Sequence, residues 1–416
     1  MQIVQSFWSK PSSNDQGTGS NLRNMGGWPE LRYFYYAWAL SSLKFSEYFE
    51  DLTLFTDKEG KYILVDQLKL PYTKVFVELD QLNTYSPKLW AIGKLYTYSR
   101  QTTPFIHADG DFIPFRKFSK QFLQGNLLVQ SKESGLDKFY LPILNSVKSS
   151  FRDIPEEIKN PVTKEAESAN LGIVGGHNID FFRNYSRKAF DFIDKNADRL
   201  DAIQVGEFNC IAEQYLFYQM AMKRNLDVKF LLPLVSPSFA ELIRFHMIPN
   251  LSSYIHIIGS YKQDTMVLRS LERTLRRFYP TIYDRINSLM GFSSDASTLD
   301  FSKERYLETI RKKSIHTLRF RLSRKYDIQF KQSHSNTVIL RYTDKQTNIT
   351  QEITMQKIHR DILEFNKERS KSLSQILDFV ASKYMMRSNR IKMGESILSF
   401  LLNQWYNRDI LEISIR

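Results

Sequence analysis

The stretch Thr103–Phe115 constrains the fold more than any other part of this chain. An apolar run stops at two carboxylates that flank a glycine, in the order Asp109-Gly110-Asp111, and a second apolar run follows and closes at Pro114. The pattern predicts a short buried strand, a sharp turn at the glycine and a second short strand. Two carboxylates on one turn repel each other, and a hard divalent cation such as Mg²⁺ or Mn²⁺ would neutralise them. For these three residues taken alone, a surface turn that binds nothing is the alternative.

Length and composition describe a globular protein with room for two domains. The chain has 416 residues, of which 42% are apolar and 25% are charged, and this composition excludes general disorder. The single cysteine, Cys210, excludes an internal disulfide and fits a reducing compartment. The N-terminus shows no signal-peptide pattern, and no apolar run approaches the roughly 20 residues that span a bilayer. We therefore expect a soluble, cytoplasmic protein with no transmembrane segment.

Charge divides the chain into two parts. The whole chain has a formal net charge of +13. Residues 301–416 contain 23 Lys and Arg but 12 Asp and Glu, a net charge of +11, whereas residues 1–300 contain 35 and 33, a net charge of +2. The asymmetry indicates two modules with different partners. We expect a first domain over residues 1–290, a linker over 291–301 and a basic second domain over 302–416.

The first part of the chain alternates between strand-like and helix-like segments. Beside the opening stretch, strands are predicted over 3–8, 52–57, 75–78, 126–130, 169–176 and 230–234, and helices over 28–49, 90–101, 139–149, 181–195 and 208–222. Such alternation is typical of an α/β fold with a mainly parallel sheet. Ligands bind beyond the carboxyl ends of strands in these sheets, which is where Asp57, Asp109 and Asp111 fall.

A second informative stretch is Tyr254–Lys262. A strand-like run delivers His256, a borderline metal ligand, and a turn at Gly259 then leads to Lys262, whose ammonium group suits phosphate. A core histidine followed by a surface lysine is the alternative for this stretch alone.

Both stretches resemble motifs of glycosyltransferases with the nucleotide-sugar-binding GT-A architecture, and they are most similar to those of the glycogenin-like, family-eight enzymes. The Asp-x-Asp pair of that family matches Asp109 and Asp111. Its His-x-x-Gly-x-x-Lys motif matches His256, Gly259 and Lys262. The resemblance covers roughly residues 1 to 280 and rests on short motifs in the right order.

Two further segments resemble the same family, with departures. The strand segment Asn170-Leu171-Gly172 is similar to an Asn-x-Gly motif, and Glu213-Gln214 is similar to an acid–Gln pair in which the family usually has Asp. After Lys262 the family usually continues with Pro-Trp, and this chain continues with Gln263-Asp264.

The resemblance implies a GT-A-type, Rossmann-like, mainly parallel sheet flanked by helices, and divalent-metal-dependent transfer of a hexose from a nucleotide-sugar, expected to be a UDP-sugar. It implies that Asp109, Asp111 and His256 bind Mn²⁺ or Mg²⁺ and that Asp109 also reaches the ribose. Lys262 and the backbone of Gly259 would meet the diphosphate, where the metal and Lys262 stabilise leaving-group charge. Asp111 and Lys262 are accordingly the leading catalytic candidates.

Three more residues are candidates for donor or acceptor chemistry. Lys94, on the predicted helix that also carries Arg100, is a candidate contact for phosphate or sugar, with a solvated helix face as the alternative. Asp57 is a candidate for holding the nucleotide base. The similar family retains anomeric configuration and needs no dedicated base, but an inverting enzyme would need a carboxylate, and Glu213 is then the candidate.

The basic part is predicted as a small α+β domain. A basic helix is expected over 303–324, followed by strands over 326–331, 337–343 and 349–355, helices over 356–366, 373–384 and 393–405, and a strand over 410–415. Three strands followed by three helices resemble winged-helix-like peptide-recognition domains of enzymes that modify ribosomally made peptides. Such domains add a leader peptide as a strand to the sheet edge, which implies a peptide or protein acceptor. A DNA-binding winged helix, and a basic face that is solvated or rests on anionic lipid, are alternatives.

The sequence therefore favours a metal-dependent glycosyltransferase whose C-terminal domain selects a peptide or protein acceptor rather than DNA. The alternative from another class is a non-catalytic protein with a transferase-like fold whose basic domain recruits a peptide or nucleic-acid partner. The presence of both aspartates together with His256 and Lys262 favours the enzyme.

Overall fold

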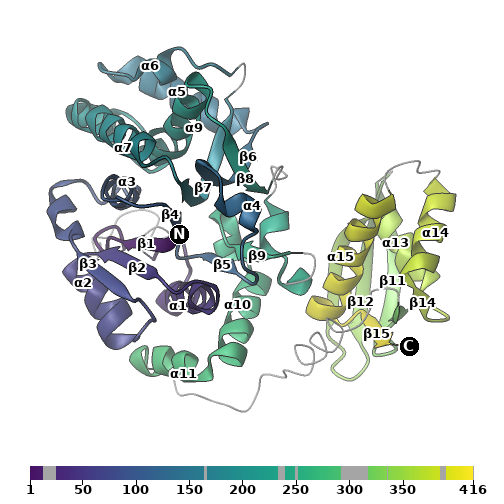
Figure 1. The fold of residues 1–416 in the computed structure, drawn as a ribbon. Coiled ribbons are helices and arrows are strands. Elements are labelled where there is room, and N and C mark those ends of the chain that lie inside the picture. The colour runs from purple at the N-terminus through teal and green to yellow at the C-terminus, as the bar shows by residue number, and fades with distance from the viewer. Residues whose placement is uncertain are drawn as a thin grey trace. The chain divides into compact units, whose positions relative to one another are not determined.

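The computed structural model describes residues 1–12, 25–163, 166–232, 239–248, 252–291, 317–334, 336–384 and 390–415. The chain divides into two compact units (Figure 1). The first unit comprises residues 1–244 and 253–295, and the second comprises residues 245–252 and 296–416. All of the expected linker except residue 291 lies outside the described residues.

A seven-stranded mixed sheet forms the centre of the first unit, with the strand order β3-β2-β1-β4-β7-β6-β8. The strands are β1 (Gln2–Phe7), β2 (Leu52–Thr56), β3 (Lys74–Val77), β4 (Phe105–Ala108), β6 (Leu127–Glu133), β7 (Ser168–Gly176) and β8 (Val228–Leu232). Parallel pairs join β1 to β2 and β4, β2 to β3, and β6 to β8, whereas β7 runs antiparallel to β4 and β6. The predicted α/β fold with a mainly parallel sheet is confirmed.

The sheet has a separate apolar core on each face, because successive side chains of a strand point to opposite sides. One core contains Val4, Phe105, Val129 and Val174, and the other contains their neighbours Ile3, Ile106, Leu128 and Ile173. Figure 1 shows α3 (Ile92–Ser99) and α7 (Ile179–Asp194) on one side of β1 and β2, and α1 (Leu31–Tyr48) on the other. The strands β2, β4 and β7 are accordingly buried along their whole length, as expected for a sheet covered on both faces.

Among the remaining helices of the first unit, α5 (Asp137–Ser150) agrees with its predicted segment to within a few residues, and α8 (Val205–Cys210) and α9 (Leu216–Lys223) fall on the predicted helix over 208–222. The helices α10 (Thr265–Phe278) and α11 (Pro280–Leu289) were not predicted. The predicted helix over 208–222 is interrupted by a π-helical turn, Ile211–Tyr215, between α8 and α9. π-Helical turns are rare in proteins, and those that do occur are frequently found at functional sites. This one contains Glu213.

A second sheet, of two short strands, lies next to the turn that follows β4. β5 (Phe112–Pro114) pairs antiparallel with β9 (Tyr254–His256), so Phe112 lies opposite His256. The pairing brings a segment from the end of the first unit against the turn that follows β4.

The second unit contains two three-stranded sheets of antiparallel strands, ordered β14-β10-β15 and β11-β12-β13. Its elements are β10 (Leu318–Leu322), β11 (Tyr326–His334), β12 (Thr337–Asp344), β13 (Thr350–Gln356), α13 (Lys357–Phe365), β14 (Lys371–Ser372), α14 (Leu373–Tyr384), α15 (Arg390–Arg408) and β15 (Leu411–Ile415). The three predicted strands, three helices and final strand are thus present.

The expected basic helix over 303–324 is wrong at its end, because Leu318–Leu322 forms β10; residues 303–316 lie outside the described residues. Leu318, Phe320 and Leu322 are buried, and the arginines between them are not. This period of two indicates a strand, which the basic composition of the segment had obscured. Across the described ranges, no helix is both long enough and apolar enough to cross a membrane.

Candidate metal-binding and active site

The Asp-Gly-Asp motif forms the turn between β4 and β5, at the carboxyl end of β4. Asp109 N donates a hydrogen bond to Gly172 O of β7 at 2.9 Å. Trp38 of α1 lies against the glycine, because a Cβ at Gly110 would lie 2.3 Å from the indole atom Cε2. Gly110 is therefore required for the close approach of the indole, in addition to any freedom that it gives the turn.

His256 joins the two carboxylates from β9. Its Nε2 lies 3.3 Å from Asp111 Oδ1, and one ligand atom from each of Asp109, Asp111 and His256 lies within 4.8 Å of the others. Gly172 leaves room for the imidazole, since a Cβ there would lie 2.2 Å from His256 Cε1. The structure thus brings together two carboxylates and one imidazole, a group that could hold a metal ion.

Lys262 contacts the same group from a 3₁₀ turn after β9. Its Nζ lies 2.7 Å from Asp111 Oδ2, donates to Gly26 O at 2.8 Å and lies 5.6 Å from the centre of the Trp28 ring. The turn begins at Gly259, whose φ of +55° lies in the left-handed region that favours glycine. The predicted glycine turn and the lysine after it are both found at the site.

The ionisation of Asp111 follows from these contacts. Burial raises the pKa of this carboxyl group, but the charge of Lys262 and the nearby imidazole of His256 lower it by more, so the pKa lies below its ordinary value. Asp111 is therefore a carboxylate at neutral pH.

Lys94 of α3 bridges Asp109 to Glu213. Its Nζ lies 2.9 Å from Asp109 Oδ1 and 2.7 Å from Glu213 Oε1, and Tyr98 OH donates to the same Oε1 at 3.0 Å. Burial lowers the pKa of Lys94, but Asp109 and Glu213 raise it above its ordinary value. Burial raises the pKa of Glu213, and Lys94 opposes that change. Glu213 is fully buried and acts here as the counter-ion of Lys94.

A cavity of about 1250 Å³ in the first unit brings most of the predicted site residues together. Its lining includes Lys94, Asp109, Asp111, His256, Gly259 and Lys262. Glu213 does not line it, and Arg100 instead pairs with Glu78 at 3.1 Å.

Asp57 also lies away from the cavity lining. Its carboxylate accepts hydrogen bonds from Ser9 N, Ser9 Oγ and Gly60 N, each at 2.7 Å. These bonds cap the short helix α2 (Lys58–Lys61) and tie it to the chain after β1.

Sequence reasoning missed three carboxylates of the cavity lining, Glu133, Asp201 and Glu207, of which only Glu133, at the end of β6, is buried. Glu133 Oε1 accepts from Asn170 Nδ2 at 2.9 Å and its Oε2 from Tyr140 OH at 2.5 Å, and both partners line the cavity together with Glu133 and Gln214. Burial raises the pKa of Glu133, and the two hydrogen bonds oppose that change. The Asn-x-Gly motif was the one sequence signal that pointed to this carboxylate, because its asparagine, once buried, needs a hydrogen-bond partner. Nothing in the sequence around Glu133 identified Glu133 as that partner.

The fold and the site define a mixed α/β protein with a candidate Asp-Asp-His metal site in its first unit. Residues 1–289 match the model of a family of unknown function, DUF6734, and the chain belongs to that family. No curated protein is similar to the chain in sequence.

Among solved structures, the chain is similar to that of mouse xyloside xylosyltransferase 1 in its apo form. The identity is 10%, the TM-score is 0.31, and the similarity covers 55% of this chain and 84% of that chain. A likeness with this TM-score identifies neither the fold nor the activity of the present chain.

Proposed function

We propose that the protein is a glycosyltransferase that moves a hexose from a nucleotide-sugar, expected to be a UDP-sugar, to a hydroxyl acceptor with the aid of a divalent metal. One observation carries the proposal. Motifs that lie far apart in the sequence, Asp-x-Asp, Asn-x-Gly and His-x-x-Gly-x-x-Lys, meet around a single cavity. The sheet, with its antiparallel β7 among mainly parallel strands, agrees with a GT-A-type arrangement.

The residues of the candidate metal group fit a divalent cation by their chemistry. Two carboxylates and one imidazole suit Mn²⁺, whereas Mg²⁺ prefers oxygen ligands alone. Asp109, Asp111 and His256 would hold the ion, which would stabilise the charge that forms on the departing diphosphate.

The lysines would complete the charge balance of the site. Lys262, directed at Asp111, is placed to meet the diphosphate and to stabilise leaving-group charge as it grows. Lys94, held between Asp109 and Glu213, would present a fixed positive charge to the phosphate or the sugar. If the reaction inverts, Glu133 is better placed than Glu213 to act as the base, because Glu133 reaches the cavity.

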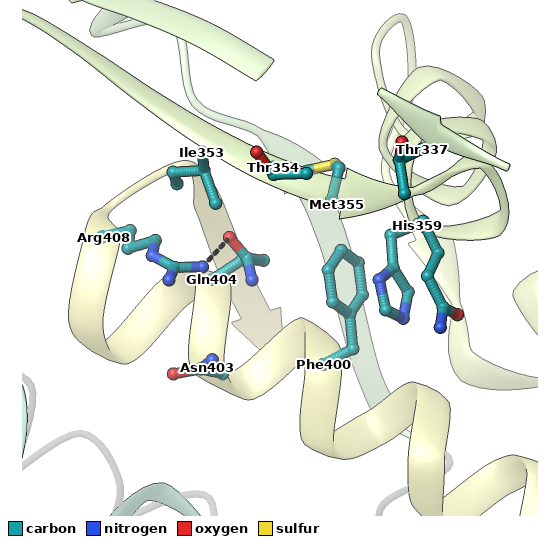
Figure 2. A pocket seen from close by; sticks show the side chains of 10 residues that line it. Thr337, Ile353, Thr354, Met355, His359, Phe400, Asn403, Gln404 and Arg408 are labelled. Atoms are coloured by element: carbon teal, nitrogen blue, oxygen red, sulfur yellow. Dashed lines mark hydrogen bonds between the residues drawn. The ribbon is translucent and has the colours of Figure 1, made fainter. Parts of the chain in front are cut away.

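We also propose that the second unit recognises a peptide or protein acceptor. A pocket of about 360 Å³ lies between β13 and α15 (Figure 2). Figure 2 shows Ile353, Thr354 and Met355 of β13 across from Phe400 and Arg408 of α15. Among the described strands, β13 pairs with β12 alone, so its outer edge could accept an added peptide strand, as in the winged-helix-like domains that the sequence resembles.

A thermal-shift panel of nucleotide-sugars, each with Mn²⁺ or with EDTA, tests the catalytic proposal. A ligand that binds the folded protein raises its melting temperature, and we expect a UDP-sugar to do so more strongly with Mn²⁺, because Asp109 and Asp111 repel a bare diphosphate. If no nucleotide-sugar shifts the melting temperature in either condition, the proposal is wrong. Binding without hydrolysis or transfer would instead favour the non-catalytic alternative.

A further inference from the structure

The side chain of Gln130, in β6, is a buried amide that the site described above does not use. It is fully buried, and neither its Oε1 nor its Nε2 has a hydrogen-bond partner in the part of the chain that the structure describes. Buried amides are almost always paired, because they lose their bonds to water on folding. An unpaired amide beside a candidate site therefore requires an explanation.

His256 contains a second atom of this kind. Its ring is buried and its Nε2 faces Asp111, but its Nδ1 has no hydrogen-bond partner among the described residues. Both atoms border the space above Gly172, where a Cβ would lie 2.5 Å from Gln130 Oε1 and 2.7 Å from His256 Nδ1. Gln130 Oε1 and His256 Nδ1 are therefore separated by no more than the sum of these two distances. Because residue 172 is a glycine, it has no side chain that could lie between them.

The pairing of β6 with β7 is also irregular at this position, where Gln130 alone lies opposite three residues of β7. Val129 pairs with Val174 and Ser131 pairs with Asn170, with an irregularity in register between the two pairs, at Gln130. Such irregularities redirect a side chain and occur frequently beside active sites. The part of β7 that the irregularity spans contains Gly172, the residue that makes room for both unpaired groups.

We propose that Gln130 is a positioning residue for His256: its amide oxygen accepts a hydrogen bond from Nδ1–H and holds the ring so that Nε2 faces Asp109 and Asp111. A metal-binding histidine usually donates its second ring nitrogen to such a partner, which sets both the tautomer and the orientation of the ring. The expected effect of this hydrogen bond on metal affinity rests on the proposed function. The hydrogen bond between Gln130 and His256 itself does not depend on that function.

The test compares Gln130→Met, which keeps a similar volume but removes the amide, with the control Gln219→Met. Gln219 is also fully buried, but its amide is paired with Val162 N, Thr163 Oγ1 and Glu167 O. The first readout is the NMR spectrum of the ring nitrogens in metal-free protein that contains isotope-labelled histidine. The chain has 7 histidines, and the signals missing in His256→Gln identify those of His256.

We expect the ring-nitrogen signals of His256 to move in Gln130→Met and to stay in place in Gln219→Met. Unchanged signals in Gln130→Met would overturn the proposal, whether or not the protein binds metal.

The second readout is the affinity for Mn²⁺ alone, measured by calorimetry. We expect Gln130→Met to weaken binding roughly 10–100-fold, as loss of a metal ligand's hydrogen-bond partner does elsewhere, and Gln219→Met to leave it unchanged. The melting temperature should fall in Gln219→Met, because that substitution leaves the partners of a paired, buried amide unsatisfied. A lower melting temperature with unchanged signals and unchanged affinity would show a purely structural role for Gln130. If the wild-type protein binds no Mn²⁺, the proposed metal site is wrong, and the spectra alone decide the role of Gln130.

Discussion

The two units use charge in different ways. In the first unit, whose sequence is nearly neutral, Lys94, Asp109, Asp111 and Lys262 gather around one cavity. In the second, whose sequence is strongly basic, the buried Asp361 of α13 joins elements of the unit to one another. Its carboxylate lies 2.6 Å from Arg360 and 2.7 Å from Lys383, and it accepts a hydrogen bond from Tyr384.

The difference shows that the net charge of a segment is a poor guide to where its chemistry lies. The carboxylate of Asp361 is satisfied by its own neighbours and does not line the 360 Å³ pocket of the second unit. The charges of the first unit instead line a space large enough for a ligand. Four predictions test this distinction, from the largest expected effect to the smallest.

Asp111→Asn should lower the rate of Mn²⁺-dependent hydrolysis or transfer roughly 10²–10³-fold, because it removes the charge of a proposed metal ligand that also pairs with Lys262. Steady-state rates with a nucleotide-sugar measure the effect. The matched control is Asp51→Asn, which alters an exposed aspartate 3.6 Å from Lys74 and should leave the rate unchanged. Wild-type rates in Asp111→Asn would show that this carboxylate is structural.

Lys262→Ala should lower kcat roughly 10–10²-fold and change KM less, because its ammonium group stabilises charge that grows in the transition state. Lys61→Ala, which breaks an exposed pair with Asp66, serves as the control. A variant in which only KM changes would make Lys262 a ground-state contact for the diphosphate.

Phe400→Ala should reduce transfer to a peptide acceptor several-fold and leave donor hydrolysis intact, since Phe400 lines the pocket of the second unit and stacks on His359 at 4.2 Å. The control is Phe379→Ala, which removes a ring stacked on Phe365 outside that pocket. Equal losses of hydrolysis and transfer would contradict separate roles for the units. Binding of a peptide strand should weaken only moderately with salt, whereas DNA binding would weaken steeply.

Asp361→Asn should destabilise the second unit by about 1–3 kcal/mol, because hydrogen bonds to a charged group are lost, without changing donor hydrolysis. Burial raises the pKa of Asp361, but Lys383, Tyr384 and Arg360 lower it below its ordinary value. The stability that this carboxylate contributes is therefore present above the pKa of the unfolded state and is lost as the pH falls through the lower pKa of the folded state. Acid titration followed by circular dichroism should show this loss in the wild type and in the control Asp327→Asn, and a weaker dependence in Asp361→Asn. An identical acid transition in all three proteins would contradict the assignment.

Local patterns in the sequence were enough to locate most helices and strands and the three members of the candidate metal group. Most strands contain apolar runs and most helices are amphipathic, and Asp109, Asp111 and His256 each lie at or beside a strand end. The resemblance to glycosyltransferase motifs then grouped these three residues as metal ligands. The same reasoning failed for β10, where arginines alternate with buried apolar residues, and it could not detect that β7 runs antiparallel to its neighbours.

The partners of these residues depended on contacts between segments far apart in the chain, and no local pattern encodes such contacts. Lys94 meets Glu213 because α3 packs beside the π-helical turn, and this contact makes Glu213 a counter-ion. Glu133 enters the cavity because β6 pairs with β7 beside Asn170. Side-chain chemistry and spacing can be recognised one segment at a time, whereas burial, pairing and access to a cavity are properties of surfaces that exist only after the sheet has assembled.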